Sequence, residues 1–162
     1  MYKRQLFSLY TIGTAVRKQA NNEAADIANP LGRVLKVGKD NFDKDIDTLE
    51  LKLAEAIMAE RPAIDSGIGF IKIISVIAPL AGLLGTVTGM IVTFQMITLY
   101  GTGDPKLMAG GISQALVTTV LGLLVAIPTS LLHSFTQSSA RGIIGVLEEQ
   151  STGILAERAE SK

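Results

Sequence analysis

Two long stretches without formal charge constrain this chain more than any other feature of its sequence. Residues 73–100 form the first, 28 residues long, and residues 107–140 form the second, 34 residues long and interrupted only by the ionisable His133. A run of 18 or more apolar residues predicts a membrane-spanning helix. A helix of 28 residues reaches about 42 Å, whereas the hydrocarbon core of a bilayer is about 30 Å thick. Both runs are therefore long enough to span a membrane and extend beyond it. The alternative, two buried helices of a soluble domain, needs core helices too long for 162 residues.

Composition argues against several classes of function. Fifteen basic and fifteen acidic side chains give zero net charge, which disfavours a nucleic-acid binder that neutralises phosphates. The chain contains no cysteine and one histidine, so we expect no disulfide, no thiolate site and no multi-histidine metal cluster. It has no GxSxG, no HExxH and no glycine loop followed by lysine that would bind phosphate. We therefore expect neither an enzyme nor a bound metal or cofactor.

The segments around the two runs predict an all-α integral membrane protein. The turn between the runs is short and rich in Gly, Asp and Pro, so the two transmembrane helices should be antiparallel neighbours. We expect these helices to extend into the cytoplasm, where amphipathic helices join them. The expected parts are a cytoplasmic helical region over 1–66, a transmembrane helix over 67–100, a short periplasmic turn over 101–107, a transmembrane helix over 108–140 and a cytoplasmic C-terminal helix over 141–162.

Two local signals organise the first of these parts. Asn29 precedes Pro30 and is expected at a helix boundary or turn, because a residue before proline avoids the helical region. Residues 43–60 carry apolar side chains at helical spacing among acids and lysines, which predicts an amphipathic helix. That helix should end or kink near Arg61, where Pro62 interrupts the pattern.

The distribution of basic residues predicts an orientation. Near the spans, Arg61, Lys72, Arg141 and Arg158 lie on the side of the two chain ends, and Lys106 lies in the connecting turn. By the positive-inside rule, both ends of the chain are cytoplasmic and the turn lies on the outer face.

Each predicted span carries a narrow stripe of small and polar residues. At 100° per residue, the first stripe lies within roughly 40° of one line and the second within roughly 80°. The stripes are Ser75, Gly82, Thr86, Gly89 and Thr93 in the first span, and Gly111, Gln114, Thr118, Gly122 and Thr129 in the second. Close helix packing and the lining of a water-filled path both remain open as interpretations. Gln114 favours an interface or a lumen, because an amide in hydrocarbon needs partners.

The spans contain no Asp, Glu, Lys or Arg, so this chain offers no carboxylate to carry a proton across the membrane. His133 is ionisable, but it lies near the cytoplasmic end of its span, where an interfacial role is the better interpretation. If protons cross, another protein must supply the carrier.

The sequences of the two spans carry a family resemblance. Residues 78–94 (APLAGLLGTVTGMIVTF) and 110–128 (GGISQALVTTVLGLLVAIP) resemble the proton-channel family of ExbB, TolQ and MotA. Residues 101–119 (GTGDPKLMAGGISQALVTT) look most like ExbB-type proteins of TonB-dependent outer-membrane transport, especially the long variety with an added periplasmic region. The resemblance covers roughly residues 45–160, and the flagellar and cell-division branches remain open on fold alone.

The resemblance implies a homo-oligomer in the bacterial inner membrane. Family members form a pentameric ring in the lipid bilayer around an ExbD-like single-span partner that carries a membrane aspartate. Proton flow through the lumen would drive motion that a TonB-like protein passes to outer-membrane receptors. Thr86 and Thr119 match lumen-facing threonines of the family. Thr119 lies about 140° from Gln114 on an ideal helix, so either it meets a neighbouring subunit or the helix departs from ideal geometry.

The sequence departs from the family pattern in two places. Gln114 stands where ExbB and TolQ have a glutamate, and an amide keeps the size but cannot titrate. Proton carriage should then fall on the partner's aspartate, with weaker coupling as a second consequence. Family members also have a further membrane helix before the cytoplasmic region, so we expect an N-terminally truncated piece.

Two hypotheses about function result. The first is a proton-channel subunit of an ExbB/ExbD/TonB-type complex, with a TolQ- or MotA-type motor subunit as its variant. The second is a non-conducting scaffold around partner helices. The expected proton-path residues are Thr86, Gln114, Thr118 and Thr119, with a secondary pore or packing stripe of Ser75, Gly82, Gly89, Thr93, Gly122 and Thr129.

Overall fold

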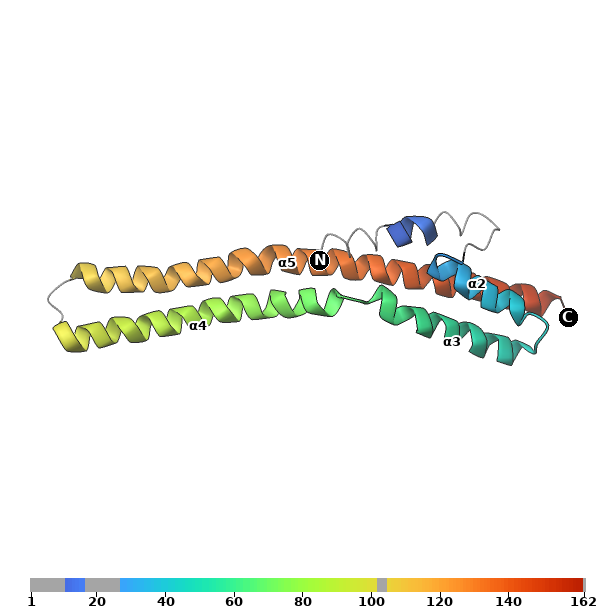
Figure 1. Ribbon diagram of the computed structural model, residues 1–162, viewed down its shortest axis with the longest axis horizontal. Helices are drawn as coiled ribbons and strands as arrows, with labels where there is room; N and C mark the ends of the chain where they lie inside the picture. The colour runs from blue at the N-terminus through green and yellow to red at the C-terminus, as the bar shows by residue number, and fades with distance from the viewer. Residues whose placement is uncertain (1–10, 17–26, 102–104, 162) are drawn as a thin grey trace. The chain divides into compact units, whose positions relative to one another are not determined.

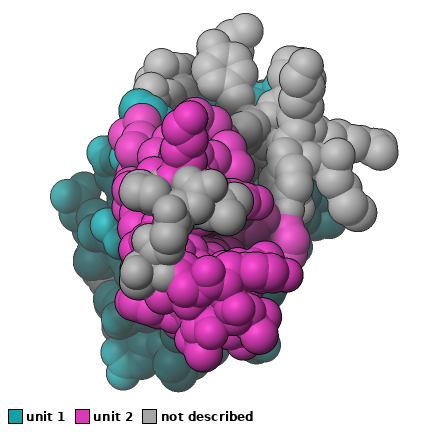
Figure 2. Space-filling view, turned by 90° about the vertical axis from the view of Figure 1, so that its left-hand side faces the viewer, with its two compact units in different colours: residues 1–67, 135–162 teal, residues 68–134 magenta. Residues whose placement is uncertain are grey.

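The computed structural model describes residues 11–16, 27–101 and 105–161 (Figure 1). Regular structure in these ranges is helical, which confirms the predicted all-α class. The elements are α2 (Pro30–Asp40), α3 (Ile46–Ile64), α4 (Ile68–Tyr100) and α5 (Pro105–Glu160), together with a helical segment over residues 11–16. The chain divides into two units, shown in teal and magenta in Figure 2: unit 1 is Met1–Gly67 with Phe135–Lys162, and unit 2 is Ile68–Ser134.

Unit 2 consists of α4 and the first part of α5, which run antiparallel as the short turn predicts (Figure 1). Both helices are long and apolar enough to cross a membrane. Their large apolar side chains point outward: Leu84 is 64% exposed and Leu124 is 65% exposed. Such a surface is unfavourable in water, because apolar groups gain free energy on leaving it. Surrounding lipid or apolar partner helices would remove that cost.

Helix α5 is one continuous helix of 56 residues. Residues 141–160 continue it without a break, so the C-terminal helix expected over 141–162 is not a separate element. The physical reason is the absence of a strong helix breaker, since the chain has no proline after Pro128. Pro128 itself lies inside α5, and Pro79 lies inside α4.

In unit 1, side chains cap the starts of both short helices. Asn29 is the N-cap of α2, and its side-chain oxygen accepts the N–H of Gly32 at 2.8 Å. The helix boundary expected at Asn29 is thus confirmed. Asp45 caps α3 in the same way and accepts the N–H of Thr48 at 3.0 Å. Pro62 lies within α3, which continues to Ile64; a proline so close to a helix end removes one backbone bond without ending the helix.

The core of unit 1 is aliphatic. Seven of its described side chains are exposed by 1% or less: Val16 from the segment 11–16, Leu31 and Val34 from α2, Leu49, Leu53 and Ile64 from α3, and Leu147 from α5. Gly38 lets these helices approach closely. A Cβ there would lie 2.7 Å from Cδ1 of Ile154 and 3.3 Å from Cδ2 of Leu53. The amphipathic pattern predicted for residues 43–60 therefore buries its apolar face against α2 and α5.

Candidate functional site

Glycines form the contact between α4 and α5 within unit 2. A Cβ added at Gly82 would lie 2.9 Å from the carbonyl oxygen of Thr118, and one added at Gly122 would lie 2.8 Å from the carbonyl oxygen of Ala78. Because the atoms met are backbone, they cannot rotate away. We call this contact the α4–α5 seam; its residues are Ala78, Gly82, Gly85, Gly89, Thr93, Gly111, Ala115, Thr118 and Gly122.

Two threonines fill glycine positions of the facing helix. Thr118 of α5 occupies the space that a side chain at Gly85 would need, and Thr93 of α4 does the same at Gly111. Thr93 is 5% exposed, and its hydroxyl donates to the carbonyl of Gly89 in its own helix at 2.9 Å. Small residues that let backbones approach are typical of helix contacts in membranes.

The hydroxyl of Thr118 reaches both helices. It lies 2.6 Å from the carbonyl oxygen of Ala115 in α5 and 3.2 Å from the carbonyl oxygen of Gly82 in α4. A hydroxyl has one proton to donate, so the two carbonyls share it. Thr118 thus contributes a polar link between α4 and α5.

The other residues expected to line a proton path differ in their exposure. Thr86 is half-buried, and its hydroxyl donates to the carbonyl of Leu83 at 2.7 Å. Thr119 is half-buried, with its Cα 3.2 Å from the Cβ position at Gly82, whereas Gln114 is exposed. These contacts show where the side chains lie within one chain; that they line a path stays a prediction.

The secondary stripe separates into two groups. Gly82, Gly89, Thr93 and Gly122 pack helix against helix in the seam. The hydroxyls of Ser75 and Thr129 instead donate to carbonyls of their own helices. Ser75 bonds Lys72 at 2.7 Å, and Thr129 bonds Val125 at 2.8 Å and Ala126 at 3.0 Å.

The stripe of small and polar residues predicted for the second span leaves out buried alanines of α5. Ala115 is 2% exposed, and Ala126 lies on the same side of the helix, 8% exposed. That stripe consists of glycines and polar residues, and alanine cannot be told from the other apolar residues of a span by composition. The spacing of Ala115, Thr118, Gly122 and Ala126 follows helical periodicity, and this signal could have identified them.

The described residues contain no cluster of side chains that could hold a metal ion. Among them, no three His, Asp or Glu side chains lie together as a metal site would need. Residues 68–101 and 105–134 contain Lys72, Lys106 and His133 as their basic or titratable nitrogen groups and no carboxylate side chain. The chemistry available along the seam is that of hydroxyls, amides and backbone carbonyls.

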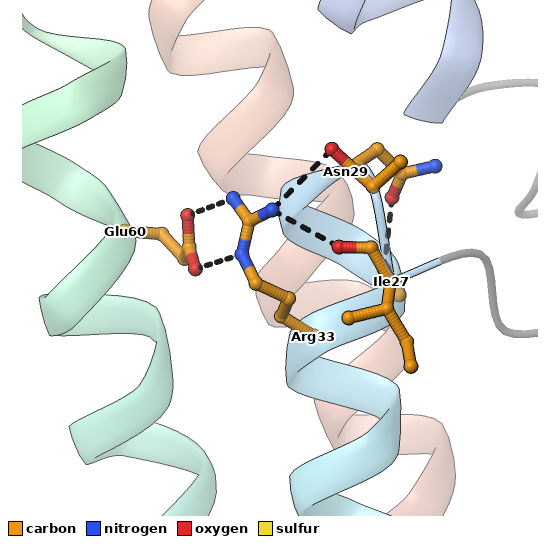
Figure 3. A network of polar contacts seen from close by, with 6 residues as sticks. Ile27, Asn29, Arg33 and Glu60 are labelled. Atoms are coloured by element: carbon orange, nitrogen blue, oxygen red, sulfur yellow. Dashed lines mark hydrogen bonds and ion pairs between the residues drawn. The ribbon is translucent and has the colours of Figure 1, made fainter.

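A polar network lies in unit 1 instead (Figure 3). Arg33 of α2 makes a bidentate pair with Glu60 of α3, with both nitrogen–oxygen distances at 2.6 Å. Its remaining nitrogen donates to the carbonyls of Ile27 and Ala28 at 3.1 and 3.3 Å. The hydrogen bond to Glu60 raises the pKa of the Arg33 guanidinium above its ordinary value, so the group stays charged. The network joins α2, α3 and the segment before α2.

Comparison with known proteins identifies relatives that match much of this chain, including the α4–α5 seam. The sequence model of the MotA/TolQ/ExbB proton channel family matches residues 26–149. An ExbB homolog among the biopolymer transport proteins of Methanothermobacter thermautotrophicus is 35% identical over 121 residues, which cover 72% of this chain and 41% of that protein. Biopolymer transport protein exbB1 of Vibrio cholerae is 36% identical over 100 residues, covering 60% of this chain and 42% of that protein.

A shorter match has higher identity. Biopolymer transport protein ExbB of Aquifex aeolicus is 44% identical over 64 residues, covering 40% of this chain and 43% of that protein. The chain therefore spans less than half the length of each of these three relatives.

Proposed function

Because this chain belongs to the MotA/TolQ/ExbB proton channel family, we propose that it is a proton-channel subunit of an inner-membrane complex of the ExbB/ExbD/TonB type. The complex uses the proton motive force to energise transport across the outer membrane. The family match over residues 26–149 carries the proposal, because it includes α4, the apolar part of α5 and the whole α4–α5 seam. Relatives named as biopolymer transport proteins favour the ExbB branch over the TolQ and MotA branches.

The proposed assembly is a ring of copies in the membrane, with both ends of this chain in the cytoplasm and the turn after α4 outside. The positions of Arg61, Lys72, Arg141 and Arg158 against Lys106 support that orientation. The outward-facing apolar side chains of α4 and α5 support contacts with lipid and with further helices. The ring encloses an ExbD-like single-span partner, which acts with a TonB-like protein.

In this proposal Thr86, Gln114 and Thr119 face the water-filled lumen. Seam contacts pair Gly85 with Thr118 and Gly89 with Ala115, which puts Thr86 and Thr119 at one depth and Gln114 about one turn away. The hydroxyl of Thr86 already donates to Leu83, so its oxygen remains free to accept a hydrogen bond from water. Since residues 73–100 and 107–140 contain no carboxylate, the proton carrier is the partner's aspartate.

A non-conducting scaffold is the second candidate. It is favoured by Gln114, whose amide cannot take up and release a proton, and by the lack of acids in both apolar runs. In that case the same helices would hold partner helices in place without forming a continuous water path.

Thr86→Leu tests the proposed lumen, with Thr88→Leu as its matched control on the same helix. The hydroxyl of Thr88 donates to the carbonyls of Leu84 and Gly85, and its direction lies about 160° from that of Thr86 on an ideal helix. In liposomes holding the complex, Thr86→Leu should lower proton flux by at least about tenfold by excluding water, while Thr88→Leu keeps it. Flux that survives in Thr86→Leu would show that Thr86 does not line the path.

Gln114→Glu tests whether that position meets water. If Gln114 faces the lumen, the variant should assemble normally and conduct at least as well as the wild type, because water solvates a carboxylate. A dry interface would instead penalise the buried charge, and the complex would fail to assemble in size-exclusion chromatography.

A further inference from the structure

Several contacts of the α4–α5 seam meet at Gly82. Its carbonyl oxygen lies 3.2 Å from the hydroxyl of Thr118, and its Cβ position is 3.2 Å from the Cα of Thr119. In the repeating pattern of an α-helix, the same carbonyl also accepts the backbone N–H of Thr86, four residues later. A carbonyl oxygen has two lone pairs and can accept both bonds.

Thr118 is held in this position by packing as well as by its hydroxyl. Its side chain fills the space beside Gly85, so it faces α4 rather than open surface. Its hydroxyl proton is shared between two carbonyls, those of Ala115 and Gly82, and is committed to the protein. Such a side chain is poorly suited to line a water path, but well suited to fix one helix against the other.

We propose that Thr118 is a positioning residue of the proton path: its bond to the Gly82 carbonyl fixes the depth at which Thr86 and Thr119 lie beside each other. The proposal rests on the proposed function, since it assigns Thr118 a part in conduction. It also revises the expectation that Thr118 lines the path. Thr118 acts through its neighbours and does not itself meet the proton.

Thr93 provides a matched comparison within the same seam. It too fills a glycine position of the facing helix, that of Gly111, but its hydroxyl donates to Gly89 of its own helix. Replacement of either threonine by valine keeps the branched shape and removes the hydroxyl. Thr118→Val removes the bond between helices together with a bond within α5, whereas Thr93→Val removes only a bond within α4.

The bond itself can be observed without any assay of conduction. Gly82 and Gly122 are the two glycines in the sequence that precede a leucine, so ¹³C-carbonyl glycine combined with ¹⁵N-leucine selects these two carbonyls in solid-state NMR. In the full chain in lipid, Thr118→Val should move the Gly82 resonance upfield and leave that of Gly122 in place. Thr118→Ser and Thr93→Val should leave the Gly82 resonance near its wild-type position. An unmoved Gly82 resonance in Thr118→Val would overturn the proposal.

Proton flux through the complex tests the positioning role. Hydrogen bonds between membrane helices are typically worth a factor of about three in an equilibrium, so Thr118→Val should reduce flux about threefold. Thr118→Ser should restore most of it, and Thr93→Val should conduct like the wild type. A shifted Gly82 resonance with unchanged flux would overturn the positioning role. A wild-type complex that is intact but does not conduct would overturn the proposed function and the positioning role together, while the NMR result still reports the bond.

Discussion

The two units hold their helices together by opposite means. In unit 1, large aliphatic side chains such as Leu53 and Leu147 are fully buried, and a bidentate ion pair joins α2 to α3. In unit 2, the large aliphatic side chains point outward, and the helices meet through glycines, alanines and two threonines. The same residue type, leucine, therefore marks the core of one unit and the outer surface of the other.

The difference follows from the surroundings of each unit. In water, burial of leucine is favourable by about 1.5–3 kcal/mol, so a leucine core can hold three helices together. In hydrocarbon, leucine gains little by leaving lipid, and helices associate through close backbone packing and polar bonds. The contrast supports a membrane setting for unit 2 and an aqueous one for unit 1, and it can be tested in each unit separately.

The largest expected effect is in the core of unit 1. Leu53→Ala should lower the free energy of unfolding by about 2–5 kcal/mol, because it leaves a cavity where a side chain is 1% exposed. Leu51→Ala, two residues earlier on α3 and 70% exposed, is the matched control and should change it by less than about 0.5 kcal/mol. Urea titration of the full chain in detergent, followed by circular dichroism, measures both. Equal losses of unfolding free energy in the two variants would show that Leu51 packs against other groups and is not on a free surface of α3.

The next effect comes from adding one methyl group to the seam. Gly122→Ala should destabilise the α4–α5 pair by about 1–3 kcal/mol, because the new Cβ would lie 2.8 Å from the Ala78 carbonyl and 3.0 Å from the Cα of Gly82. Gly110→Ala on the same helix is the control, since a Cβ there meets nothing within 4 Å. Unfolding in increasing SDS would report the difference. A Gly122→Ala protein as stable as Gly110→Ala would contradict the seam.

The ion pair of unit 1 should contribute less than its core. Arg33→Ala leaves Glu60, whose side chain is 14% exposed, without its partner. It should lower the free energy of unfolding by about 1–2 kcal/mol. Lys52→Ala removes the exposed pair with Glu55 and serves as the control, with no resolvable change expected. The same urea titration compares the two. If Arg33→Ala behaves like Lys52→Ala, the network of Figure 3 does not hold α2 to α3.

The smallest effect concerns acid stability. The hydrogen bond from Lys52 lowers the pKa of the Glu55 carboxyl. The stability that this pair contributes is therefore present above the ordinary carboxyl pKa and is lost as the pH falls through the lowered value. Because Glu55 is fully exposed, water and salt screen the pair. Glu55→Gln should therefore unfold with the same midpoint as the wild type at pH 7 and at pH 3. A pH-dependent difference between the two proteins would show that the pair is stronger than its exposure indicates.

Much of the fold follows from local sequence signals. The two charge-free runs predict α4 and the first part of α5, and Asn29 before Pro30 predicts the start of α2. The helices are predicted to extend into the cytoplasm, but the change from apolar to charged composition after residue 140 does not reveal that α5 continues unbroken through residue 160. Composition changes where a helix leaves the membrane, but the backbone hydrogen bonds need not stop there.

The candidate site is less predictable, because its contacts join positions far apart in the chain. A helical wheel places Thr118 and Thr119 about 100° apart and cannot show which of them faces α4. In the structure the Thr118 side chain fills the space beside Gly85 of α4, whereas Thr119 meets the Gly82 position through its backbone Cα. The pairing of Arg33 with Glu60, 27 residues apart, could not be selected among ten basic and ten acidic side chains in residues 1–66.

Proton flux into liposomes tests the central claim most directly. The complex of this protein with its ExbD-like partner would be compared with a complex whose partner carries asparagine in place of the membrane aspartate. Flux that is present in the first and absent in the second is the predicted result, since residues 73–100 and 107–140 contain no carboxylate of their own. Two intact complexes that both fail to conduct would contradict the proton-channel function and favour the scaffold. Equal flux in both would contradict the assignment of the proton carrier to the partner.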